Sequence, residues 1–217
     1  MSTTNNAQNV STGKPNVSGA VYRAPLGTTL PTAADETLNE AFEGMGYISE
    51  DGLTNSKTRE SEQIPAWGGD VVEDVQTKKN DTFKAKFIEA LNIEVLKAAH
   101  GNSNVSGSSM AAGVTVRSNS KELDHSSWVI DMILKGGVKK RTVIADGKPT
   151  TIEDIVYRDN QVIGYDMTIT AYPAEEFDGD TSRDYLKKIT TESSDSDDSG
   201  ESGDSGESGD SGESGTP

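Results

Sequence analysis

The sequence has no cysteine and only two histidines among its 217 residues, and aromatic side chains make up 6% of it. The absence of cysteine excludes disulfide scaffolds, Cys-based zinc sites and thiol catalysis. No run of apolar residues approaches the eighteen that a spanning helix needs, and the N-terminus lacks the basic start and apolar core of a secretory signal. We therefore expect a soluble protein that is not exported and has no membrane partner.

Candidate catalytic and metal-binding residues are equally scarce. Base catalysis would depend on His100 or His125, for which the surrounding sequence favours capping or surface roles. The segment Asp178–Asp184 imitates the first half of a calcium loop, but Arg183 and Ile189 stand where that loop requires glycine and a bidentate acid. We therefore predict no enzymatic activity, no metal and no cofactor.

Charge and low-complexity sequence divide the chain into three parts. The formal charge is −16, but nine acids lie in the segment from residue 191 to the end, which repeats Ser-Gly-acid triplets and contains no base. We expect residues 191–217 to be a disordered acidic tail, with a docking or phosphorylated segment as the alternative. Residues 1–16 are polar and predict a flexible arm, which leaves 17–190 as one domain. Residues 1–190 carry 20 bases against 27 acids, a net −7, which argues against binding to duplex DNA.

Inside the body the main pattern is period-2 alternation, clearest over Val162–Tyr172, where apolar and polar residues fall on opposite faces. The residues Glu89–His100 predict the one helix, which Gly101 would end. Together these elements predict a mainly β fold, a two-sheet sandwich or barrel with one flanking helix. Turns are expected at Glu50–Gly52, Asp146–Pro149 and Asp159–Asn160, and weaker strands at Ala20–Arg23, Phe42–Ser49, Thr82–Phe87, Val114–Arg117, Trp128–Leu134, Arg141–Ala145 and Ile152–Tyr157.

Two segments carry unusual side chains for their position. Leu53–Lys79 is long and polar, yet it brings Trp67, Val71 and Val72 together. It is interpreted either as an extended hairpin that contacts another subunit or as a loop folded over its own core. The basic cluster Lys139-Lys140-Arg141 is compatible with nucleic acid, an acidic neighbour, or a salt-bridged or solvated hairpin.

Five blocks of the sequence stand out in order along the chain: Val21–Thr32, Gly46–Leu53, Ala66–Asp70, the helix end Glu94–Lys97 before Gly101, and Gly164–Tyr172. Together these blocks resemble the major tail proteins of siphophages, in particular those that infect Gram-positive and actinobacterial hosts. The resemblance runs in consistent order from Ala20 to Asp184, although residues 102–112 match poorly and some relatives carry an immunoglobulin-like domain where this chain has the acidic repeat.

The resemblance implies a structural virion protein with the tail tube fold. Hexameric rings of such proteins stack into a tube through which the DNA genome passes without specific binding. Four strands from each of six subunits would give a barrel roughly 48 Å across. Implied partners are further copies of the chain, the tape measure protein, and the tail-tip and terminator proteins, with assembly in the host cytoplasm and a final location in the virion tail.

On this interpretation some residues acquire expected places. We expect Trp67, Val71 and Val72, together with the basic cluster, at interfaces between subunits. An acidic and small polar lumen would repel phosphates, and its candidate residues are Glu43, Asp131, Asp166 and Thr168, with a place on the outer, solvent-facing surface as the alternative for each. The alternatives are a capsid decoration protein or other virion β-domain, and a β-sandwich binding module.

Overall fold

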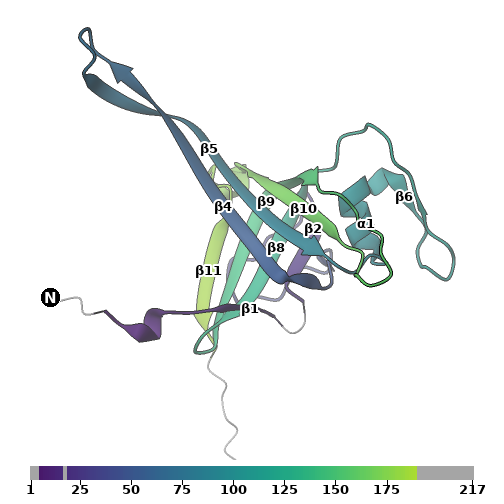
Figure 1. Cartoon of the computed structure of the whole chain (residues 1–217). Coiled ribbons are helices and arrows are strands. Elements are labelled where there is room, and N and C mark those ends of the chain that lie inside the picture. The colour runs from purple at the N-terminus through teal and green to yellow at the C-terminus, as the bar shows by residue number, and fades with distance from the viewer. Residues whose placement is uncertain (1–4, 17–18, 190–217) are drawn as a thin grey trace, which may run out of the picture.

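The computed structural model describes residues 5–16 and 19–189 (Figure 1). The acidic tail expected at 191–217 lies outside them. The described part contains eleven strands, one α-helix and three short 3-10 helices: β1 (Gly13–Pro15), β2 (Val21–Pro25), β3 (Glu43–Gly44), β4 (Ile48–Pro65), β5 (Val71–Phe87), β6 (Val105–Ser106), β7 (Thr115–Val116), β8 (Ser126–Leu134), β9 (Val138–Ile152), β10 (Tyr165–Tyr172), β11 (Arg183–Lys188), α1 (Ile93–His100), and the 3-10 helices Ala7–Asn9, Asn102–Asn104 and Glu175–Phe177.

Nine strands form one antiparallel sheet in the order β3-β2-β8-β9-β10-β5-β4, with β1 paired to β8 and β11 paired to β9. The strands β6 and β7 form a small second sheet. The predicted fold class, mainly β with one helix, is confirmed. The strand β1 lies inside the segment that was expected to be a flexible N-terminal arm.

Alternating side chains give the main sheet two buried faces. On β8, Trp128 and Ile130 point into a core that includes Val95 and Leu96 of α1, so the helix covers this face. Val129 points the other way, into a smaller core that the segments around Phe42 and Phe177 cover. Period-2 geometry thus places the centre of the sheet between a helix and two irregular segments.

The helix is shorter than its apolar pattern predicts. It begins at Ile93, because the side chain of Asn92 caps it by accepting a hydrogen bond from the Glu94 backbone N–H at 3.0 Å. The Glu89 carboxylate is used elsewhere: it accepts from the Tyr47 backbone N–H at 2.9 Å and so ties the helix entry to the start of β4. Gly101, with φ of 94°, ends the helix as expected.

The turn predicted at Asp146–Pro149 is wrong, because β9 runs through it without a break. Gly147 serves packing: a Cβ there would lie 2.7 Å from Cδ1 of Trp128 and 3.1 Å from Cγ2 of Ile169. Pro149 stands where β8 no longer pairs with β9 and where the β10 ladder shifts register, so its missing N–H is tolerated.

Replacing Gly147 with alanine is therefore expected to lower the free energy of unfolding by about 1–3 kcal/mol through overpacking. The matched control is Gly44→Ala, whose added Cβ meets only Tyr22 at 4.0 Å. Chemical denaturation of the two variants checks the difference, and equal stabilities would contradict the packing explanation.

Other sequence expectations need smaller corrections. The Glu50–Gly52 turn is a bulge inside β4, because Ile48 pairs with Phe87 and Leu53 with Ala85, which leaves four residues opposite one. The strand predicted at Phe42–Ser49 is interrupted, and β3 and β4 are its two parts. Apart from Ile152, the strand predicted at Ile152–Tyr157 is irregular, and the predicted turn at Asp159–Asn160 is closed by an isolated Arg158–Gln161 bridge.

Candidate functional surfaces

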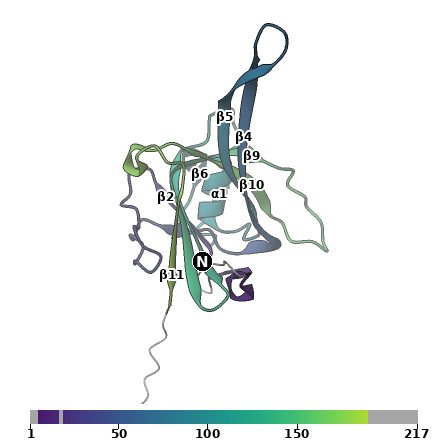
Figure 2. The ribbon, with the colours of Figure 1, turned by 90° about the vertical axis from the view of Figure 1, so that its left-hand side faces the viewer.

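The segment from Ser56 to Asn80 forms a two-stranded antiparallel hairpin that stands away from the body, here called the β-arm (Figures 1 and 2). Most of its side chains are exposed along the whole length of both strands. The structure confirms the extended hairpin and shows that the alternative, a loop folded over its own core, is wrong. The part of the arm from Val71 to Asn80 alone is roughly 33 Å long at about 3.3 Å per residue.

The far end of the β-arm carries an apolar patch, here called the arm tip: Ile64, Trp67, Val71, Val72 and Val75. Trp67 lies in the turn and is fully exposed, and Val72 is 62% exposed. Exposed large apolar side chains concentrated at one end of an arm are typical of an interaction site. Three of the predicted interface residues, Trp67, Val71 and Val72, thus lie together at this end.

At its root the β-arm is fixed to the body through Asp81, the first buried residue of β5, which is 2% exposed. Its carboxylate accepts hydrogen bonds from Asn55 Nδ2 at 2.7 Å, Thr181 Oγ1 at 3.0 Å and Ser182 Oγ at 2.9 Å. The donors come from β4 and from the segment before β11. The network therefore locks the direction in which the arm leaves the core.

The strands β4, β5, β10 and β9 expose a common face, here called the polar sheet face, whose other side is core. In register, Lys84 of β5 lies between Thr54 of β4 and Thr168 of β10, and Thr82 lies between Ser56 and Thr170. Thr150 of β9 extends the row, with its Oγ1 2.8 Å from Oγ1 of Thr170. The side chains between these positions, such as Phe83, Met167 and Ile169, are buried.

Charge on the polar sheet face is balanced. Lys84 Nζ lies 3.1 Å from Glu153 and 3.6 Å from Asp166, and Lys148 is paired with Glu122 at 3.1 Å. These neighbours hold the pKa of Lys84 above its ordinary value, and the hydrogen bond that Lys84 donates to Glu153 contributes most. The face is thus rich in hydroxyl groups and has no excess of positive charge.

The predicted lumen residues separate into three groups. Asp166 and Thr168 lie on the polar sheet face. Glu43 is exposed on β3, at the opposite end of the strand order. The prediction for Asp131 is wrong, because its side chain is 2% exposed and paired inside the subunit.

The basic cluster is held by acids of its own subunit. The guanidinium of Arg141 forms a two-pronged pair with Asp131 at 2.7 and 2.8 Å and also donates to the backbone carbonyls of Ala33 and Glu36. At 2% exposure it cannot reach a neighbouring subunit, which corrects its predicted interface role. Lys139 pairs with Asp131 at 3.0 Å and Lys140 with Asp184 at 2.9 Å, and an additional interface role for these two lysines stays a prediction.

Both histidines, and the acids of the calcium-like segment Asp178–Asp184, make contacts within the subunit. His125 Nδ1 lies 2.6 Å from Asp146, and the ring of His100 meets that of Tyr165 edge-on, where burial lowers the pKa of His100. Arg183 donates to both Asp178 and Asp180 at 2.9 and 3.1 Å, so a guanidinium stands between the carboxylates of the calcium-like segment.

Within residues 5–16 and 19–189, no group of three or more acids and histidines is placed to hold a metal ion. No helix in this part of the chain is long and apolar enough to cross a bilayer.

A mainly β subunit with a polar sheet face and a projecting arm that ends in an apolar tip has the features of a structural assembly component. The chain belongs to the phage tail tube protein family, whose model matches residues 3–182. Proteins of this kind assemble with copies of themselves into a tube and form part of the virion tail. Comparison with curated proteins gives no match.

Proposed function

We propose that six copies of this chain close into a ring, that rings stack into a siphophage tail tube, and that the genome passes through its lumen. The observation that carries this proposal is the polar sheet face, together with the family. Four neighbouring strands of the main sheet, with core on one side and hydroxyl groups on the other, suit a wall segment of a wide barrel. Ring closure would also cover strand edges that are an aggregation hazard in a single subunit.

The polar sheet face is the proposed lining of the lumen. Threonine and serine hydroxyl groups hydrate well and carry no charge, and Lys84 is neutralised by Glu153 and Asp166. A phosphate backbone moving past this surface meets no cluster of unpaired cations, so it is not retained. The lining differs from the expected acidic one: neutrality, and not repulsion, keeps the DNA sliding.

Adding positive charge to this face should convert the tube into a DNA-binding surface. Tubes of the double variant Thr168→Lys/Thr170→Lys are expected to retain duplex DNA at low salt and to release it as salt rises, because each new phosphate contact adds to the counterion release. Co-sedimentation of DNA with tubes, before and after nuclease treatment, measures this. The control Ser108→Lys/Ser109→Lys places the same charges on the exposed segment between β6 and β7. Equal protection of DNA by the two variants would contradict the lumen assignment.

The assembly itself is tested by electron microscopy of the purified full chain at high concentration. Tubes or stacked rings with sixfold symmetry are expected. A capsid decoration protein or a free binding module would stay dispersed under these conditions, and a monodisperse monomer at all concentrations would overturn the proposal.

A further inference from the structure

Three stretches of the chain that contain no acidic residue meet at one end of the main sheet (Figure 1). They are residues 5–16, residues 132–140 and residues 185–189. The strand β1 pairs with the end of β8, and the last residues of β11 pair with the start of β9. Six lysines therefore gather in this region, here called the basic end: Lys14, Lys135, Lys139, Lys140, Lys187 and Lys188.

Some of these lysines lie in one row across the sheet. The register places Lys14 of β1 opposite Ile133 of β8, Ile133 opposite Lys139 of β9, and Lys139 opposite Lys187 of β11. At about 4.8 Å between strands, the row from Lys14 to Lys187 spans roughly 14 Å. Like charges directly opposite each other, as in Lys139 and Lys187, destabilise a sheet unless acids offset them.

Acids of the subunit pair with half of the lysines. The ion pairs are Lys139 with Asp131 at 3.0 Å, Lys140 with Asp184 at 2.9 Å, and Lys187 with Asp35 at 2.7 Å. Lys14, Lys135 and Lys188 are exposed and form no ion pair with any residue that the structure describes. The basic end thus presents three unpaired positive charges.

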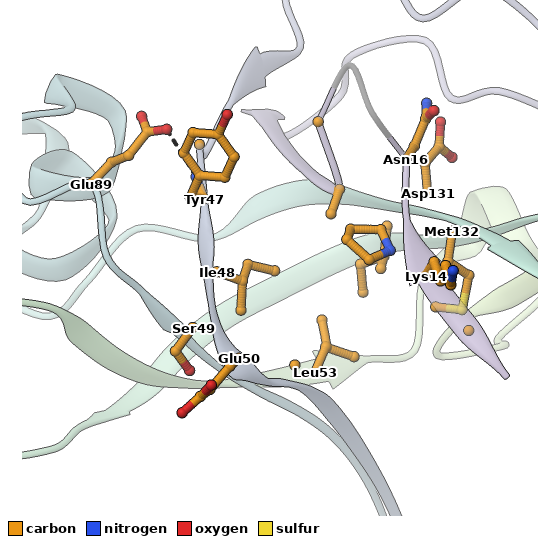
Figure 3. A pocket seen from close by; sticks show the side chains of 17 residues that line it. Lys14, Asn16, Tyr47, Ile48, Ser49, Glu50, Leu53, Glu89, Asp131 and Met132 are labelled. Carbon is orange, nitrogen blue, oxygen red and sulfur yellow. Dashed lines mark hydrogen bonds between the residues drawn. The ribbon is translucent and has the colours of Figure 1, made fainter.

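The groove beside β1 contains acids, but they do not pair with Lys14. This groove has a volume of about 990 Å³, and its lining includes Lys14, Glu50, Glu89 and Asp131 (Figure 3). Figure 3 shows Glu50 and Glu89 on the opposite side of the groove from Lys14. Asp131 is buried and already forms ion pairs with Arg141 and Lys139.

An acidic peptide begins at this same end of the subunit. The backbone N–H of Ile189 donates to the Gly137 carbonyl at 2.9 Å, so the last described residue lies beside the turn between β8 and β9. Residues 190–217 contain nine acids and no base. The first acid, Glu192, is three residues from Ile189, which is at most about 11 Å along an extended chain. Each later acid follows the preceding one within three residues.

We propose that residues 190–217 lie over the basic end of their own copy and neutralise Lys14, Lys135 and Lys188. The contact is within one copy because the segment begins beside these lysines, which gives a local concentration in the millimolar range. Successive carboxylates are at most about 11 Å apart, so one segment can reach all three lysines. The segment thus competes with other polyanions, above all nucleic acid, for this surface. The inference does not depend on the proposed ring or tube.

Carbodiimide cross-linking of the purified full chain tests the contact. The reagent joins an amine directly to a neighbouring carboxylate, and mass spectrometry identifies the joined peptides. Mixing heavy-isotope-labelled with unlabelled protein shows whether both peptides come from one copy. Links from residues 190–217 are expected at Lys14, Lys135 and Lys188, within one isotopic type. Salt of about 0.5 M should reduce these links at least about fivefold, because it screens exposed charges.

Lys79 and Lys121 are the internal controls of this experiment, because both are exposed and lie outside the basic end. Equally frequent links to these two lysines would overturn the location of the contact. Links mainly between the two isotopic types would overturn its restriction to one copy. The absence of links from residues 190–217 to any lysine would overturn the contact itself.

The competition is tested with duplex DNA. A full-length variant with all nine acids of the segment replaced by amides is expected to bind DNA on the order of tenfold more tightly than the unsubstituted chain at about 50 mM salt. Three lysines that contact phosphates predict a slope of log affinity against log salt of about −2.7. The substitutions are Glu192→Gln, Asp195→Asn, Asp197→Asn, Asp198→Asn, Glu201→Gln, Asp204→Asn, Glu207→Gln, Asp210→Asn and Glu213→Gln.

Removing the unpaired lysines from this amide variant should abolish the gain. Adding Lys14→Ser/Lys135→Ser/Lys188→Ser is expected to return the DNA affinity to that of the unsubstituted chain, with unchanged thermal melting because all three side chains are exposed. The matched control removes three exposed lysines outside the basic end and should keep the gain: Lys57→Ser/Lys79→Ser/Lys121→Ser. Equal losses in the two triple variants would reveal a general effect of net charge and overturn the competition. Equal DNA affinities of the amide variant and the unsubstituted chain would overturn it as well.

Discussion

Replacing Arg141 with methionine is expected to lower the free energy of unfolding by about 3–5 kcal/mol, the largest effect of any single substitution considered. The change leaves the buried Asp131 carboxylate without its two-pronged partner and the carbonyls of Ala33 and Glu36 without their donor. Only Lys139, at 3.0 Å, then still faces this buried carboxylate, and breaking one side of a buried pair has effects of about this size because water does not replace the lost partner. Urea denaturation of purified subunits measures the loss.

Two comparisons make the result specific. Lys140→Met, next in sequence, breaks a half-exposed pair with Asp184 and is expected to cost less than about 1 kcal/mol. In Asp131→Leu/Arg141→Met both charges are gone, so its loss should be smaller than the sum of the two single losses. A small effect for Arg141→Met, similar to that of Lys140→Met, would show that the pair contributes little.

The second large effect is expected at the root of the β-arm. Asp81→Ala should destabilise the subunit by about 3 kcal/mol, because three donors, the buried Thr181 and the less buried Asn55 and Ser182, lose a charged acceptor. Amide hydrogen exchange should also speed up over residues 54–58 and 79–82, where the arm leaves the core. Exchange monitored by mass spectrometry checks the location of the effect.

Asp74→Ala is the matched control, since Asp74 lies on the exposed part of β5. It should change neither stability nor exchange at the root. Stability lost in Asp81→Ala without any local increase in exchange would contradict the role of Asp81 as the anchor of the arm.

Side-chain periodicity predicts those strands that have one face buried along their whole length. The alternation over Val162–Tyr172 predicts β10 because alternate side chains of this strand pack in the larger core along its whole length. The same rule fails for β11, where Leu186 is 60% exposed and the buried neighbours come from distant segments. It also fails for β9, because Gly147 and Pro149 resemble a turn until the positions of Trp128 and β10 are known.

Some residues of the candidate functional surfaces could also be predicted from the sequence, and others could not. Trp67, Val71 and Val72 could be singled out from the sequence as large apolar residues in an otherwise polar stretch, the structure exposes all three, and their place at an interface stays a prediction. Asp131 and Arg141 were misplaced, because charge in a sequence indicates a surface unless a partner is known. The polar sheet face needs the register of four strands, and residues as distant as Thr54 and Thr168 meet only in the folded sheet.

Because β4 and β5 continue without a break from the core into the β-arm, a small rotation in the core produces a larger displacement at the arm tip. The strands β4 and β5 pass from the packed sheet into the arm as one ladder, so the arm inherits its direction from the side chains beneath it. A rotation of about 5° at Asp81 would carry the tip, roughly 33 Å away, sideways by about 3 Å. Substitutions deep in the core, far from any neighbouring molecule, would then misalign the fit between copies before they unfold the subunit.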